Sequence, residues 1–116
     1  LGVWASSNGS SWNLINADGG GNGICSTTVP QNQWNHIAYV RNGTTWRLYL
    51  NGIVDCTVSN LSGSVDVIAT DIQAIGAWWN SETAMSDLYG YLQDFRIYNG
   101  VAKYTSNFTP PTQIAL

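Results

Sequence analysis

Carboxyl groups are the first candidates for chemistry in this chain, because paired acids cleave glycosidic bonds. That reaction normally needs two carboxyl groups about 5 to 9.5 Å apart, flanking the scissile bond. The chain has seven acidic residues, and one of them, Glu82, is a glutamate. No two acids stand at positions i and i+2, the spacing that places both on one face of a strand. We therefore expect a protein that is not an enzyme.

The single histidine, His36, raises the alternative of a nucleophilic triad with one of the serines. The sequence has no Gly-x-Ser-x-Gly elbow. His36 also stands in the middle of a predicted strand, on the same face as Trp34 and Val40. We expect it to be packed and hydrogen-bonded to backbone rather than catalytic.

A glycine-rich segment, residues 18–23, offers the oxygen ligands that Ca²⁺ prefers. Asp18 supplies a carboxylate, Asn22 an amide, and the glycines mobile carbonyl groups. One carboxylate is little charge for tight binding, so we expect no cofactor, with Ca²⁺ at Asp18 and Asn22 as the weaker alternative. Zinc is excluded on sequence grounds, because no cluster of His and Cys has the required spacing.

The adjacent tryptophans Trp78 and Trp79 predict a carbohydrate-binding surface. Neighbouring residues of a strand point to opposite faces, so one indole turns outward if the other packs inward. Beside them stand the polar side chains of Asn80 and Glu82, and Tyr89 follows. An exposed ring stacks on a pyranose while amides and carboxylates bind hydroxyl groups. The alternative is that the second tryptophan covers a sheet edge or a neighbouring subunit.

The elements that carry these residues are predicted to be short strands. Apolar and polar residues alternate in runs separated by Gly, Asn, Ser and Pro, a pattern typical of antiparallel sheets. The clearest run, residues 34–41, leads through an Asn42-Gly43 turn to residues 46–50, and through an Asn51-Gly52 turn to residues 53–58. We expect Trp34 and Trp46 to oppose each other in this hairpin and to pack in the core.

Further strands are predicted at residues 2–5, 12–16, 24–28, 66–70, 73–78 and 92–98, with a polar loop over residues 80–88 and an extended tail at residues 107–111. About eight short strands in 116 residues predict one all-β domain, an antiparallel two-sheet β-sandwich or jelly roll. Two cysteines, Cys25 and Cys56, flank the central hairpin. They are bridged in an oxidising compartment and reduced in a bacterial cytoplasm, and we expect free thiols.

Composition narrows the class of partner. Charged residues make up 9% of the chain and the net charge is −3, against about a quarter charged residues in ordinary domains. Without a basic stripe we expect no nucleic acid partner. No run approaches the roughly 20 apolar residues of a membrane span, so we expect no membrane insertion. A surface of Asn, Ser, Thr and Gly is common in extracellular and virion β proteins.

Two separated blocks of sequence resemble one known family. QWNHIAYVRNG at residues 33–43, followed by WRLYLNG at residues 46–52, is similar to the central hairpin of laminin-G-like, concanavalin A-like lectin/glucanase domains. GYLQDFRI at residues 90–97 resembles the closing strand of those domains. GVAKYTSNFTPP at residues 100–111 is similar to the ending of a subgroup frequent in bacteriophage tail, fibre and other virion proteins.

The resemblance implies a concanavalin A-like jelly roll spanning residues 1–116 as a single domain. Domains of this kind carry further N-terminal strands before the position of Leu1, so we expect a fragment of a longer chain. The missing strands would come from the rest of that chain, from a partner, or from a symmetry mate.

The resemblance also implies a function. We expect a lectin-like adhesion module of a phage or virus particle, located in the virion or otherwise extracellular. Its partners would be a host-surface glycan and other virion proteins or copies of itself. The alternative is a structural domain that decorates a capsid or tail and binds no ligand.

Overall fold

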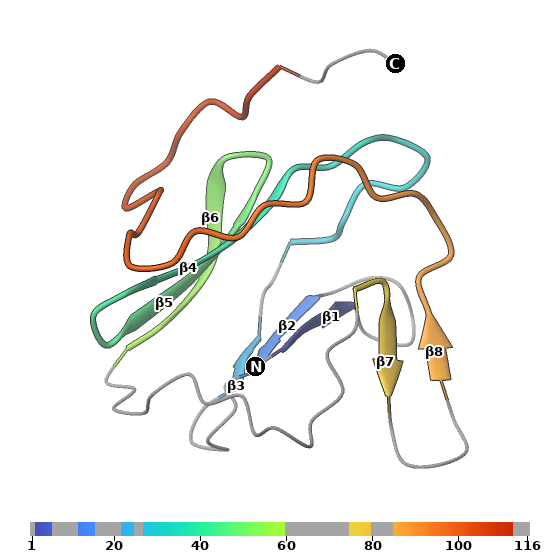
Figure 1. Ribbon diagram of the computed structural model, residues 1–116, viewed down its shortest axis with the longest axis horizontal. Coiled ribbons are helices and arrows are strands. Elements are labelled where there is room, and N and C mark those ends of the chain that lie inside the picture. Colours follow the sequence, from blue (N-terminus) through green and yellow to red (C-terminus); the bar gives the residue numbers. More distant parts are fainter. Residues whose placement is uncertain are drawn as a thin grey trace. The chain divides into compact units, whose positions relative to one another are not determined.

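The computed structural model describes residues 2–5, 12–15, 22–24, 27–59, 75–79 and 85–112. All regular structure in these ranges is β-strand, arranged in antiparallel sheets (Figure 1). The predicted all-β antiparallel class is therefore confirmed. In the described part of the chain, no helix has the length and apolar character to cross a membrane.

The chain divides into two compact units. The first consists of residues 1–65 and 100–116, and the second of residues 66–99. The first unit holds β1 (Gly2–Ala5), β2 (Trp12–Ile15), β3 (Asn22–Ile24), β4 (Ile37–Asn42), β5 (Thr45–Leu50) and β6 (Ile53–Val58). The second holds β7 (Ala77–Trp79) and β8 (Met85–Asp87). The expectation of a single domain stays a prediction.

One sheet of the first unit has the order β1-β2-β3. Its first two strands match the predicted segments closely. The third was expected at residues 24–28, but β3 runs from Asn22 to Ile24 because it pairs with β2, Asn13 opposite Ile24 and Ile15 opposite Asn22. Residues 27 and 28 lie outside any strand. Pairing with β2 thus draws Gly23 into a ladder despite the poor strand propensity of glycine.

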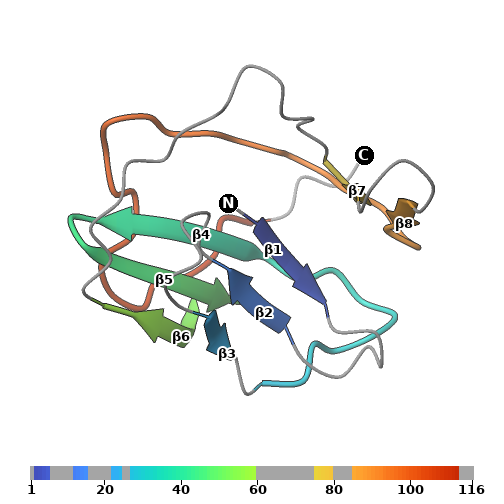
Figure 2. The ribbon, with the colours of Figure 1, turned by 90° about the horizontal axis from the view of Figure 1, so that it is seen from below.

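The other sheet has the order β4-β5-β6, with β5 in the middle (Figure 2). Its tight turns follow from the Asn-Gly pairs. Asn42 pairs with Thr45, and Gly43 takes a φ of 60° at the first turn position, where a type II′ turn requires glycine. Asn51 and Gly52 both have positive φ, 51° and 82°, as in a type I′ turn. The predicted three-stranded hairpin is confirmed.

The start of β4 differs from the prediction, which began this strand at residue 34. Residues 34–36 lie outside the ladder. The His36 N–H donates to Asn51 Oδ1 at 2.8 Å, the Asn51 N–H donates to His36 O at 2.8 Å, and Asn35 Nδ2 donates to Pro30 O at 2.7 Å. Trp34 is 51% exposed and faces no residue of β5. The expectation that Trp34 packs in the core opposite Trp46 is wrong, because the ladder pairs Trp46 with Arg41.

The core of the first unit is built on both faces of β5. Trp46 and Leu48 are buried together with Cys56 of β6, and the partly buried Tyr39 and Val58 pack against them. Tyr49, which points to the other face, is 0% exposed. Its central place in the sheet, with cover on both faces, makes β5 the most buried strand of the hairpin.

What covers Tyr49 is the C-terminal strap, residues 104–110, which matches the extended tail expected from the sequence. The Phe108 N–H donates to Gly52 O at 2.9 Å, and Asn107 Oδ1 accepts the Val54 N–H at 3.0 Å. The rings of Tyr104 and Phe108 stack with centroids 3.5 Å apart, and each meets the Tyr49 ring edge-on. The strap therefore closes one face of the β4-β5-β6 sheet.

The second unit contains a two-stranded ribbon, in which β7 pairs with β8. The expected loop at residues 80–88 thus includes a strand, β8. Residues 92–98 were expected to form a strand, and this is wrong: they are not in a ladder, and Leu92, Phe95 and Ile97 are exposed. Alternation alone predicts a strand, but a strand forms where a partner satisfies its backbone groups. The segment predicted at residues 66–70 lies outside the described residues.

Candidate functional site

The residues predicted to bind sugar lie in the second unit, as far as the structure describes them. Trp78 and Trp79 are neighbours on β7, paired with Ser86 and Met85 of β8. The ribbon continues through a hydrogen bond of 2.7 Å from the Leu88 N–H to Gly76 O, and the fully exposed Tyr89 follows it. The structure thus brings both tryptophans and Tyr89 to one ribbon. Asn80 and Glu82 lie outside the described residues.

The candidate Ca²⁺ ligands are placed in part. Asn22 is the first residue of β3, and Asp18 lies outside the described residues. Over the ranges that the structure describes, no group of three or more His, Cys, Asp or Glu residues could hold a metal ion. The Ca²⁺ alternative at Asp18 and Asn22 stays a prediction.

His36 is packed, as expected. Its ring meets Phe108 edge-on at a centroid distance of 5.5 Å and Tyr104 at 6.3 Å. It thereby extends the aromatic cluster of the C-terminal strap. Within this cluster the imidazole supplies packing area, and its backbone N–H fixes Asn51 at the neighbouring turn.

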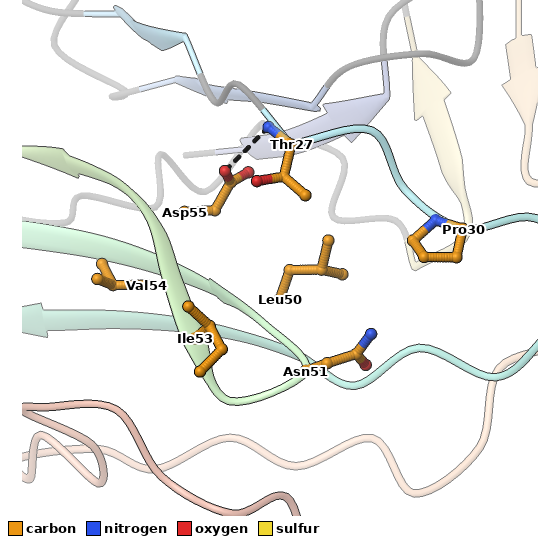
Figure 3. Close-up of a pocket in the computed structure, with 7 residues that line it drawn as sticks. All are labelled: Thr27, Pro30, Leu50, Asn51, Ile53, Val54 and Asp55. Carbon is orange, nitrogen blue, oxygen red and sulfur yellow. Dashed lines mark hydrogen bonds between the residues drawn. The ribbon is translucent and has the colours of Figure 1, made fainter.

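A pocket of about 280 Å³ lies in the first unit, where β5 turns into β6 (Figure 3). Leu50 and Asn51 at the end of β5 form part of its wall, and Thr27 and Pro30 face them from the segment that precedes β4. Its remaining wall is β6, through Ile53, Val54 and Asp55. The sequence did not predict this site, because its two segments, residues 27–30 and residues 50–55, are far apart in the chain.

The position of Asp55 in this pocket depends on a β-bulge. Leu48 pairs with Cys56 and Tyr49 pairs with Val54, so Asp55 is an extra residue that opposes nothing on β5. Bulges redirect a side chain and are frequent next to functional sites. Here the bulge turns the Asp55 carboxylate to the segment before β4, where Oδ1 accepts the Thr27 N–H at 3.0 Å.

The second oxygen of that carboxylate is the unusual feature of the site. Oδ2 of Asp55 is buried and has no hydrogen-bond partner. Most buried polar atoms in native proteins are satisfied, so an exception needs an explanation. A single acid within the apolar strand Ile53–Val58 was the available signal in the sequence.

The other walls of the pocket are apolar or already engaged. Leu50, Ile53 and Pro30 present carbon surfaces. The Asn51 side chain is used elsewhere, since Oδ1 accepts the His36 N–H and Nδ2 donates to Asn35 Oδ1 at 3.1 Å. Chemically, the arrangement suits a ligand with an apolar face and a hydrogen-bond donor at one end.

Cys56, the residue after Asp55, differs from the expectation that both cysteines are free thiols. Free thiols were favoured, but Cys56 is disulfide-bonded. The other cysteine of the chain is Cys25. The expectation failed because it was drawn from an inferred compartment and not from the fold, in which β3 and β6 are in contact.

Comparison with known proteins gives one finding. No curated protein and no solved structure matches the chain. A laminin-G-type family model, described as the concanavalin A-like lectin/glucanases superfamily, matches residues 1–104. Such a domain suggests a carbohydrate-binding type of module, and laminin-G-like domains are in general binding modules without catalytic activity. The match covers most of the sequence, and with the antiparallel strands described above it shows that the chain belongs to the concanavalin A-like lectin/glucanase superfamily.

Proposed function

We propose that the chain is a non-enzymatic, lectin-like adhesion module of a phage or virus particle that binds carbohydrate on a host surface. The observation that carries this proposal is the family match over residues 1–104. The fully exposed Tyr89, at the ribbon that bears Trp78 and Trp79, supports it by offering an aromatic surface to a sugar ring. The ending of the sequence, similar to those of virion proteins, supports the location.

The lack of paired acids in the sequence supports binding without cleavage. No two acids are spaced i, i+2 in the sequence, the spacing that would place both carboxyl groups on one face of a single strand. The disulfide at Cys56 supports a place outside a reducing cytoplasm, either on a particle surface or in another extracellular setting.

A glycan array with the whole chain tests the proposal. We expect binding to at least one bacterial or cellular surface polysaccharide, and we expect Trp78→Ala, Trp79→Ala or Tyr89→Ala to weaken it at least tenfold. Phe95→Ala is the matched control, because it removes an exposed aromatic ring of the same unit outside the ribbon. Wild-type protein that binds no surface polysaccharide would overturn the proposal.

A structural role in a capsid or tail is the second candidate, and one observation favours it. Leu92, Phe95 and Ile97 expose apolar side chains along a segment that is not in a ladder. Contiguous exposed apolar surface marks sites of protein association. Hydrogen exchange on intact particles distinguishes the two. Protection of both residues 92–97 and Tyr89 fits a purely structural role, whereas an unprotected Tyr89 leaves the aromatic ribbon accessible to sugar.

A further inference from the structure

We propose that the pocket beside Asp55 is a subsite for one pyranose ring. The subsite is built from residues of the first unit alone, whereas the aromatic ribbon belongs to the second unit. The inference rests on the proposed function in one respect, namely that the ligand of this chain is a carbohydrate. It goes beyond that function by assigning a second place where sugar binds and the group that recognises it.

The recognising group is Oδ2 of Asp55. This oxygen is buried and has no hydrogen-bond partner, while Oδ1 of the same carboxylate is fixed by the Thr27 N–H at 3.0 Å. The carboxylate is therefore held in orientation while one of its two oxygens accepts no hydrogen bond. A sugar hydroxyl is a donor of the kind that is missing, and hydrogen bonds to a charged acceptor are among the strongest that a neutral ligand makes.

The shape of the pocket suits a ring with an apolar face. Leu50 and Ile53 present carbon surface on one side, and Pro30 closes the other end (Figure 3). Ligand sites are typically apolar walls with a few polar groups that fix orientation. A volume of about 280 Å³ lies just below the range of about 300–1,000 Å³ common for larger ligands, which favours one ring over an oligosaccharide.

The same observations argue against a cation. Ca²⁺ takes about six to eight oxygen ligands, but among the lining residues that the structure describes Asp55 is the only one with a carboxylate. Both polar atoms of the Asn51 side chain are committed to Asn35 and His36. Hydroxyl recognition needs one well-placed acceptor, and that is what the bulge at Asp55 provides.

Thr27 lies directly beside the acceptor. Its side chain faces the Asp55 carboxylate in Figure 3, and the residue is exposed. In the proposed complex a ligand hydroxyl reaches the buried Oδ2 by displacing this neighbouring side chain. The Thr27 N–H, hydrogen-bonded to Oδ1, gives a direct spectroscopic probe of the event.

The test is an NMR titration of the whole chain with methyl glycosides of glucose, galactose, mannose and N-acetylglucosamine. At sugar concentrations of about 10 mM, which populate a site of millimolar Kd, we expect saturable shifts of the Thr27 and Val54 amide signals with at least one glycoside. Asp55→Asn keeps an oxygen for the Thr27 N–H and replaces Oδ2 with a donor, so we expect affinity at least tenfold lower. The matched control is Asp94→Asn, which alters an exposed carboxylate in the second unit.

The outcomes separate this subsite from the proposed function. Array binding that Trp78→Ala abolishes and Asp55→Asn leaves intact, without shifts at Thr27, overturns the subsite and leaves the adhesion function standing. Shifts at Thr27 that Asp55→Asn removes, with no polysaccharide bound on the array, support the subsite and count against adhesion. The wild-type titration needs no variant, so a poorly folded Asp55→Asn protein does not prevent the decision.

Discussion

Tyr39 shows how the environment of one residue sets its chemistry. Its ring stacks on Trp46 with centroids 4.9 Å apart and planes 21° apart, and the Arg41 guanidinium lies over the same indole at 5.2 Å. Burial raises the pKa of Tyr39 well above its usual range, because a phenolate loses hydration there, and the positive charge of Arg41 lowers it by a smaller amount. The folded protein therefore keeps this phenol neutral.

The stability of the fold should consequently fall in alkaline solution. The pKa of Tyr39 is higher in the folded than in the unfolded chain, where it is about 10. The contribution of Tyr39 to the free energy of unfolding is therefore complete at a pH below about 10, and it is lost as the pH rises toward the pKa of Tyr39 in the folded chain. We expect the free energy of unfolding in urea to decline between pH of about 10 and 11, and less steeply in Tyr39→Phe. Equal slopes in the two proteins would contradict this origin.

At the scale of elements, the sequence predicted what local pairing determines. The hairpin of β4, β5 and β6 follows from the alternation of apolar and polar residues and from two Asn-Gly turns. The three strands and both turns were confirmed. Residues 92–98 alternate equally well and yet are not a strand, because no local signal supplies their partner. Trp34 was assigned to the core on the same pattern. However, the segment that precedes β4 makes side-chain hydrogen bonds through Asn35 and Asn51, and β4 begins only at Ile37, after Trp34.

The candidate site divides in the same way. Trp78, Trp79 and Tyr89 were found from residue type, since an adjacent aromatic pair is visible in any sequence. Asp55 was not identified from the sequence, because the orientation of its side chain depends on the bulge and on a hydrogen bond to Thr27, 28 residues away. Register and long-range contacts are properties of the folded chain and have no counterpart in local pattern.

The two glycine turns give a prediction at this scale. A Cβ on Gly52 would lie 1.9 Å from Phe108 O, in addition to its φ of 82°, whereas a Cβ on Gly43 would meet nothing within 4 Å. We expect Gly52→Ala to lower the free energy of unfolding by about 3 kcal/mol, since the C-terminal strap must shift. Gly43→Ala should lower it by about 1 kcal/mol, from backbone strain alone.

Urea denaturation of both variants checks the comparison. Positive φ is common to the two positions, so the difference between them measures the close approach of the strap to the turn. Equal losses would show that the strap does not hold Gly52 in solution.

At the scale of the whole molecule, a disulfide and a hydrogen bond both connect β6 to other parts of the chain. The disulfide at Cys56 lies one residue from the hydrogen bond between Asp55 and Thr27. With so few charged residues, the chain gains little from ion pairs; the pair between Arg96 and Asp94 is exposed on both sides. The disulfide is therefore expected to be a principal stabilising element.

Reduction should test this directly. A crosslink that closes a loop between positions 25 and 56 stabilises by about 3–4 kcal/mol in the chain-entropy model. We expect dithiothreitol to lower the thermal midpoint of the wild-type chain and to leave that of a Cys25→Ala, Cys56→Ala double variant unchanged. A midpoint insensitive to the reductant in both proteins would contradict the expectation.

The C-terminal strap has a consequence for the order of events during synthesis. The ring of Tyr49 is covered by Tyr104 and Phe108, which follow it by more than 50 positions in the sequence. This face of the sheet therefore stays open until residue 108 has emerged from the ribosome. Contacts between such distant positions slow folding, and an uncovered strand invites association with other chains. The first unit is thus completed only after the residues of the second unit have been synthesised, and nascent chains that stall before the strap leave this face open to aggregation.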